Sequence, residues 1–88
     1  MKTVKYVVTG KVQGVWFRAS TQKQAQSLGL TGYAHNLPSG QVEIKATGDA
    51  QQHEALLAYL HQGPELAEVS QVEVEASELV QFTDFTTG

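Results

Sequence analysis

Near the start of this chain a β-branched run leads through a short loop with two glycines into a helical pattern, and this change of period constrains the fold most. Residues 4–9 are apolar and largely β-branched, which predicts a strand. After the loop, buried-type residues recur at helical spacing, and Gly29 stands where a helix-ending glycine belongs. These recurring residues are Phe17, Thr21, Ala25 and Leu28. A strand, a loop over residues 10–14 and a helix start therefore follow one another directly.

A hairpin is predicted next. Residues 31–37 and 41–47 are typical of strands, and in the second of them apolar side chains alternate. Residues 37–40, Leu-Pro-Ser-Gly, suit a type I turn, because proline takes its second position and glycine its fourth.

The second half of the chain adds a helix and two strands. Asp49, followed three residues later by Gln52, predicts a helix with a capping box, which the Gly-Pro pair at 63–64 ends. Its apolar stripe consists of His53, Leu56, Leu57 and Leu60. Residues 69–77 predict a fourth strand and residues 82–85 a short fifth.

The order β-α-β-β-α-β predicts an α+β, ferredoxin-like sandwich, in which two helices cover one face of an antiparallel sheet. The chain shows no linker, repeat or low-complexity tract. We therefore expect residues 1–88 to form a single domain.

Composition excludes several classes of function. The absence of cysteine excludes a disulfide scaffold, a thiolate metal site and a cysteine nucleophile. The longest apolar runs are a few residues long and no signal-peptide core follows Met1, so we expect a cytoplasmic protein that does not enter a membrane. His35, His53 and His61 match no metal-binding pattern, and we expect no metal.

Charge is divided unevenly along the chain. Residues 1–42 carry five basic and no acidic residues, and residues 43–88 carry one basic and nine acidic, so +5 and −8 give the net −3. A negative net charge argues against a general nucleic-acid binder. Either the two halves interleave and the asymmetry averages out, or the first half holds an anion site with no competing carboxylate nearby. Arg18 favours the second interpretation.

Residues 10–18 are predicted to form a phosphate-binding loop. Glycine lets backbone N–H groups converge, and a helix start adds unpaired N–H donors and the positive end of the helix dipole. Arg18, the only arginine, falls in the first helical turn, where a cation is unfavourable by about 0.3–1 kcal/mol. A bound phosphate makes the cation favourable there, because the helix dipole, the backbone amides and the guanidinium all attract the same anion. The alternative is that Arg18 caps a carbonyl or lies in solvent.

Asn36 is the only asparagine and lies near the end of a predicted strand, although asparagine is a poor strand former. It is either an ordinary residue before a turn or a neutral side chain that orients a water molecule.

These residues resemble the motifs of the acylphosphatase family. Residues 10–18, Gly-Lys-Val-Gln-Gly-Val-Trp-Phe-Arg, resemble its signature, and residues 28–37, Leu-Gly-Leu-Thr-Gly-Tyr-Ala-His-Asn-Leu, resemble its second motif. The resemblance covers essentially the whole chain. It departs from some members at Leu37, where they carry a hydroxyl residue, and at the Thr-Thr-Gly ending of residues 86–88.

The resemblance implies a hydrolase that cleaves the carboxyl–phosphate bond of small acyl phosphates by direct attack of water, with no cofactor. It implies that Arg18 binds the phosphoryl group and that Asn36 holds the attacking water. The phosphate-binding set is completed by Gln13, Gly14, Val15, Trp16 and Phe17, through their backbone amides. Expected partners are an acyl phosphate as substrate and inorganic phosphate or sulfate as product or inhibitor, with a monomeric protein that binds neither nucleic acid nor membrane.

Two other functions stay open at this point. A small-anion-binding or regulatory domain on the same fold has no need of Asn36. RNA binding by the open sheet face needs stacking aromatic residues, for which Tyr6 and Tyr33 are the candidates.

Trp16 has two possible roles: it either shields the predicted phosphate-binding loop from water or lines the site for an acyl group.

Overall fold

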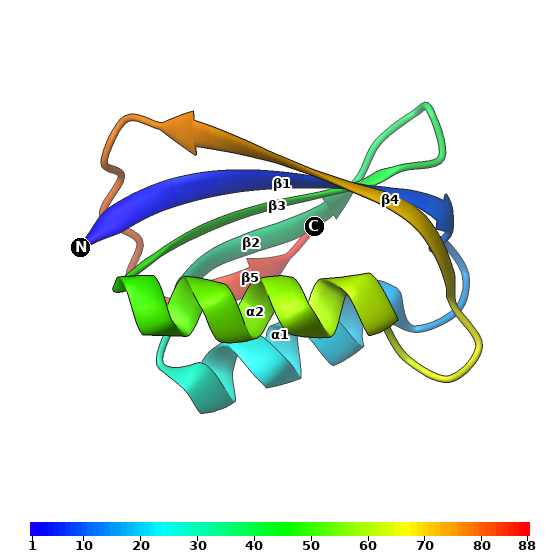
Figure 1. Cartoon of the computed structure of the whole chain (residues 1–88), viewed down its shortest axis with the longest axis horizontal. Helices are drawn as coiled ribbons and strands as arrows, with labels where there is room; N and C mark the ends of the chain where they lie inside the picture. The colour runs from blue at the N-terminus through cyan, green and yellow to red at the C-terminus, as the bar shows by residue number, and fades with distance from the viewer.

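Two helices lie together on one face of a five-stranded sheet in the computed structural model, which describes residues 1–88 (Figure 1). The elements, in chain order, are β1 (Lys2–Lys11), α1 (Phe17–Leu28), β2 (Thr31–Asn36), β3 (Val42–Gly48), α2 (Ala50–Gln62), β4 (Glu68–Ser77) and β5 (Phe85–Thr87). The predicted ferredoxin-like arrangement is confirmed.

The sheet has the strand order β4-β1-β3-β2-β5. β1 pairs antiparallel with both β3 and β4, and β2 pairs antiparallel with β3, which forms the predicted hairpin. The fifth strand differs: it covers 85–87 rather than 82–85, and it runs parallel to β2. The carboxylate of Asp84 accepts a hydrogen bond from the N–H of Phe85, and the carbonyl oxygen of Asp84 accepts one from the N–H of Gly32 at 2.9 Å, where the pairing with β2 begins.

The core lies between the sheet and the helices. Alternate residues of β1 and β3 are buried, and each helix buries one stripe, because strands repeat every two residues and helices every 3.6. The buried helix residues are Phe17, Thr21 and Ala25 on α1 and His53, Leu56 and Leu60 on α2. On β4, Val74 pairs with Tyr6 but stays 53% exposed, because β4 is an edge strand.

The helix ends follow the local signals in the sequence. Asp49 Oδ1 accepts from the Gln52 N–H at 2.8 Å, and Gln52 Oε1 accepts from the Asp49 N–H at 2.7 Å, which completes the predicted capping box. α1 ends at Gly29, which is left-handed (φ 81°). The turn over residues 37–40 is closed by the N–H of Gly40, which donates to the Leu37 carbonyl at 3.1 Å.

His53 is a structural residue inside the core. Its Nε2 lies 2.9 Å from the carbonyl oxygen of Lys2, which only accepts, so Nε2 carries the proton. Nδ1 then accepts from the Tyr6 hydroxyl at 2.6 Å. Burial raises the pKa of Tyr6 to about 12. Both polar groups are thus satisfied within the core, and both ring nitrogens of His53 are engaged in hydrogen bonds.

Candidate active site

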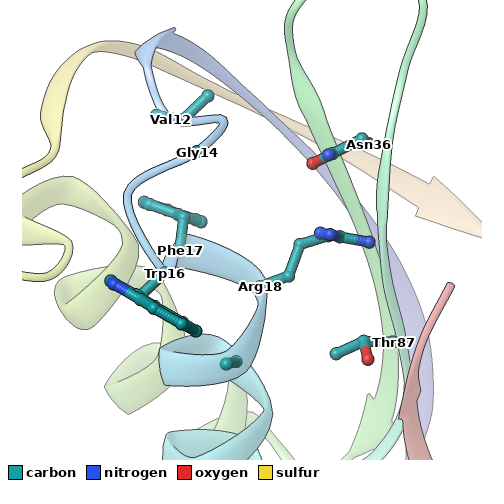
Figure 2. Close-up of a pocket in the computed structure, with 8 residues that line it drawn as sticks. Val12, Gly14, Trp16, Phe17, Arg18, Asn36 and Thr87 are labelled. Carbon is teal, nitrogen blue, oxygen red and sulfur yellow. The ribbon is translucent and has the colours of Figure 1, made fainter.

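The cleft that contains Arg18 and Asn36 lies where the β1–α1 loop faces the ends of β2 and β5 (Figure 2). Its volume is about 340 Å³. The lining residues are Val12, Gly14, Trp16, Phe17, Arg18, Ala19, Asn36 and Thr87. The structure therefore brings together the two residues that the sequence predicts to be catalytic, although 18 positions separate them in the chain.

The loop leaves the sheet through a bulge at Gly10. The pairing of β1 with β4 shifts register between Thr9 and Gly10. A Cβ atom on Gly10 would lie 2.0 Å from the carbonyl oxygen of Glu68, and its φ is +136°, so only glycine fits this close approach. The buried side chains of Val12 and Val15 then anchor the loop to the core.

The backbone N–H groups of residues 13–19 donate to no acceptor within the protein, since the first hydrogen bond of α1 runs from the Ser20 N–H to the Trp16 carbonyl, at 2.9 Å. No side chain caps this helix, and its first turn contains no acidic residue. Donors and the positive end of the helix dipole thus face the cleft with no negative charge from the helix to compensate them.

Arg18 is half-buried in the first turn of α1. Its Nη1 donates a hydrogen bond to the carbonyl oxygen of Gly88, just beyond β5. Of the alternatives left open by the sequence, the structure thus shows a capped carbonyl, although it lies on another segment and not on α1. Because a guanidinium has five N–H donors, this bond leaves most of them without a partner in the protein. Figure 2 shows the side chain of Arg18 extending from α1 towards the side of the cleft that carries Asn36 and Thr87.

Asn36 is the last residue of β2 and is exposed. Its amide makes no hydrogen bond within the protein, and it lines the same cleft as Arg18. The preceding residue, His35, points to the opposite face of the sheet, where its ring stacks on that of Tyr33 with the centroids 4.1 Å apart. His35 and Asn36 therefore lie on opposite faces of β2.

The predicted phosphate-binding residues are not equivalent. Gly14, Trp16, Phe17 and Arg18 line the cleft, whereas Gln13 and Val15 do not. The side chain of Gln13 instead turns towards the hairpin between β2 and β3, and only backbone N–H groups of Gln13 and Val15 are available to an anion.

Three lining residues, Val12, Ala19 and Thr87, were not among the predicted site residues. Val12 lies within the predicted loop. Ala19 directly follows Arg18 in the first turn of α1, and that turn borders the cleft. Thr87 reaches the site only because β5 pairs with β2, and no local pattern signals that pairing.

The open face of the sheet offers little for stacking a nucleic-acid base. Tyr6 is 1% exposed in the core. Tyr33 donates a hydrogen bond to Glu43 Oε2 at 2.7 Å, and Phe82 packs edge-on against its ring. Burial, together with the hydrogen bond and negative charge of Glu43, raises the pKa of Tyr33 to about 12. The aromatic residues that RNA binding would require are thus either buried or already packed.

No three side chains of histidine, cysteine, aspartate or glutamate come close enough together to hold a metal ion. No helix is long and apolar enough to span a membrane.

Comparison with known proteins points in one direction. The acylphosphatase family model matches residues 4–87. An acylphosphatase of Methylococcus capsulatus is 50% identical over 86 residues, which is 97% of this chain and 94% of the relative. A structure of an acylphosphatase from Coxiella burnetii superposes with a TM-score of 0.95 at 39% identity, over 99% of this chain and 92% of the other. The crystal structure of acylphosphatase from Bacillus subtilis gives a TM-score of 0.96 at 29% identity, over 100% and 99%.

Proposed function

This chain belongs to the acylphosphatase family and hydrolyses acyl phosphates, and we propose that Arg18 and Asn36 are the catalytic residues of that reaction. Water attacks phosphorus, the bond from phosphorus to the bridging oxygen breaks, and a carboxylate and inorganic phosphate are released. One observation carries the assignment of residues: Arg18 and Asn36 line a single cleft at the start of α1.

The phosphoryl group binds in the loop. The unpartnered N–H groups of residues 13–19 and the guanidinium of Arg18 surround a space next to the positive end of the α1 dipole. All of these groups favour a dianion, and all are in place before it arrives. Inorganic phosphate, the product, and sulfate, of similar shape, therefore compete for the same place.

Asn36 orients the water. An amide side chain takes no proton, but it donates two hydrogen bonds and accepts through its carbonyl oxygen, so it holds a water molecule in one direction. The proton of the water passes to an oxygen of the phosphoryl group. Because a carboxylate is a good leaving group, the reaction needs positioning and charge stabilisation rather than a general acid.

Phosphate release from acetyl phosphate tests this proposal, with the variants Arg18→Ala and Asn36→Ala and with phenyl phosphate as a monoester control. We expect the wild-type protein to release phosphate from acetyl phosphate much faster than from the ester. If both variants retain the wild-type rate, the assignment of catalytic residues is wrong, whereas a protein that binds phosphate without hydrolysis would be an anion-binding domain.

The remaining expectations, a monomer in the cytoplasm, stay predictions from the sequence. Light scattering by the purified protein checks the first of them.

A further inference from the structure

Trp16 has an unusual conformation for a bulky residue. With φ 66° and ψ 18° it is the only non-glycine residue at positive φ, a region that favours glycine. Its side chain is also 77% exposed, so the indole contributes little to the core. Glycine at this position would adopt the same backbone without strain. Neither packing nor backbone geometry therefore accounts for a tryptophan here.

Trp16 does line the cleft that holds Arg18 and Asn36. Trp16, Phe17 and Val12 lie on the side of the loop and α1, across from Asn36 and Thr87 (Figure 2). The cleft volume of about 340 Å³ lies within the range of small-molecule sites and exceeds what a phosphate group alone requires. The part next to Trp16 thus leaves room for another portion of the substrate.

The geometry of the reaction indicates which part of the substrate occupies the space next to Trp16. In phosphoryl transfer, the attacking and leaving oxygens lie roughly in line on opposite sides of phosphorus. If Asn36 holds the water on one side, the carboxylate leaves on the other side, towards the loop wall. The acyl group is therefore directed to the side of the cleft that carries the exposed indole.

From this geometry we propose that Trp16 binds the acyl group, and that the protein prefers acyl phosphates whose acyl group is uncharged and aromatic. This inference rests on the catalytic roles proposed above for Arg18 and Asn36. Arg18 is the only charged residue in the lining, and the phosphoryl group engages it, so no second cation is available for an acyl group that carries a carboxylate. An indole face stacks on a flat ring and gains little from a methyl group.

The first test compares kcat/KM for benzoyl phosphate with kcat/KM for acetyl phosphate. Trp16→Gly removes the indole and suits the left-handed backbone, and Trp16→Phe retains an aromatic ring. Leu79→Ala is the matched control, since it removes an exposed apolar side chain (55%) between β4 and β5, away from the cleft. We expect the ratio of the two constants to fall about three- to tenfold in Trp16→Gly, to fall less in Trp16→Phe and to stay unchanged in Leu79→Ala.

A ratio that Trp16→Gly leaves unchanged would overturn the inference, because a tryptophan that only shapes or shields the loop affects both substrates in proportion. The proposed function fails separately: in that case the Arg18 and Asn36 variants would match the wild type on both substrates.

The second test uses fluorescence, because Trp16 is the only tryptophan of the chain. Phenacylphosphonate and acetonylphosphonate carry a methylene group in place of the bridging oxygen of benzoyl and acetyl phosphate, so neither can be hydrolysed at that position. We expect phenacylphosphonate to change the emission of Trp16 in a saturable way and acetonylphosphonate to change it much less at equal occupancy, measured by competition with phosphate. Equal changes with both ligands, or none with either, would contradict acyl contact at Trp16.

Discussion

The side-chain amide nitrogen of Gln13 lies 2.9 Å from the carbonyl oxygen of Leu37, and a second bond of 2.9 Å joins it to the carbonyl oxygen of Gln41. One side chain thus connects the β1–α1 loop to both ends of the hairpin turn that follows Asn36. Leu37, where some relatives carry a hydroxyl residue, is held here by its backbone, since its N–H also donates to Gln41 at 2.8 Å.

Gln13 is therefore expected to act as a positioning residue that sets the place of Asn36 relative to the loop. Gln13→Ala should lower kcat on acetyl phosphate about two- to tenfold, the effect of one or two hydrogen bonds, and should change the inhibition constant of phosphate less. Steady-state kinetics with phosphate inhibition measures both. Gln51→Ala, on the exposed face of α2, is the control. Equal losses in kcat and phosphate affinity would indicate that Gln13 acts on the loop alone.

Replacement of Arg18 should remove both binding and turnover. We expect Arg18→Ala to lower kcat/KM about 10²–10³-fold, the usual effect of losing a preorganised donor. Arg18→Lys should recover little of this, because an ammonium group cannot reproduce the guanidinium fork. Phosphate titration by calorimetry and initial-rate kinetics measure the two effects, and tight phosphate binding by Arg18→Ala would show that the backbone donors suffice.

Asn36 should affect turnover more than binding. Asn36→Ala removes the group that orients the water, so kcat should fall about 10²–10³-fold while the inhibition constant of phosphate stays close to that of the wild type. His35→Ala changes the neighbouring residue on the opposite face of β2 and serves as the control. If phosphate affinity fell as much as kcat in Asn36→Ala, Asn36 would bind the phosphoryl group together with the loop N–H groups and Arg18, and would not orient the water.

Gly10, near the end of β1, and Gly14, in the loop that follows, should differ in their effect on stability. Gly10→Ala brings Cβ to 2.0 Å from the Glu68 carbonyl oxygen, so the β1–β4 pairing must shift, and the variant should lose more than about 3 kcal/mol of unfolding free energy or fail to fold. Gly14 (φ +74°) has open space around it, so Gly14→Ala should lose only about 1–2 kcal/mol from its left-handed backbone. Urea unfolding followed by circular dichroism compares them, and equal losses would argue against the close approach at Gly10.

Strongly alkaline conditions should unfold the protein through its tyrosines. The pKa of Tyr6 and of Tyr33 is raised to about 12 from an ordinary value of 10, so the folded state holds these protons more tightly than the unfolded state. The stability they contribute is complete below pH 10 and is lost as the pH rises from 10 to 12. Urea midpoints measured over that range should fall less steeply for Tyr33→Phe than for the wild type. Identical slopes would show that Tyr33 titrates normally.

Features that depend on a few neighbouring residues were predictable. The capping box of Asp49 and Gln52, the helix-ending Gly29 and the turn at residues 37–40 all form within short stretches of chain, and each appears in the structure where the sequence places it. The order of elements followed from their periods, and the β-α-β-β-α-β order has one common way to bury its apolar faces.

The site was predictable only in part. Arg18 and Asn36 stand out because each breaks a local preference, a cation at a helix start and an asparagine at a strand end. The direction of the Gln13 side chain was not predictable, since it depends on carbonyl groups 24 and 28 positions away. The parallel pairing of β5 was missed for the same reason, and with it the place of Thr87 in the cleft.

The amino-acid sequence by itself thus determined where the helices and main strands run and which loop carries unpartnered N–H donors, because period, caps and glycines act over one or two turns of chain. Only the tertiary structure decided that Asn36 and Arg18 line one cleft, that Gln13 bonds to both ends of the turn after Asn36 and that the exposed Trp16 lines the same cleft. These relationships are set by packing between segments distant in the chain, and residue order along a single segment carries no such distances.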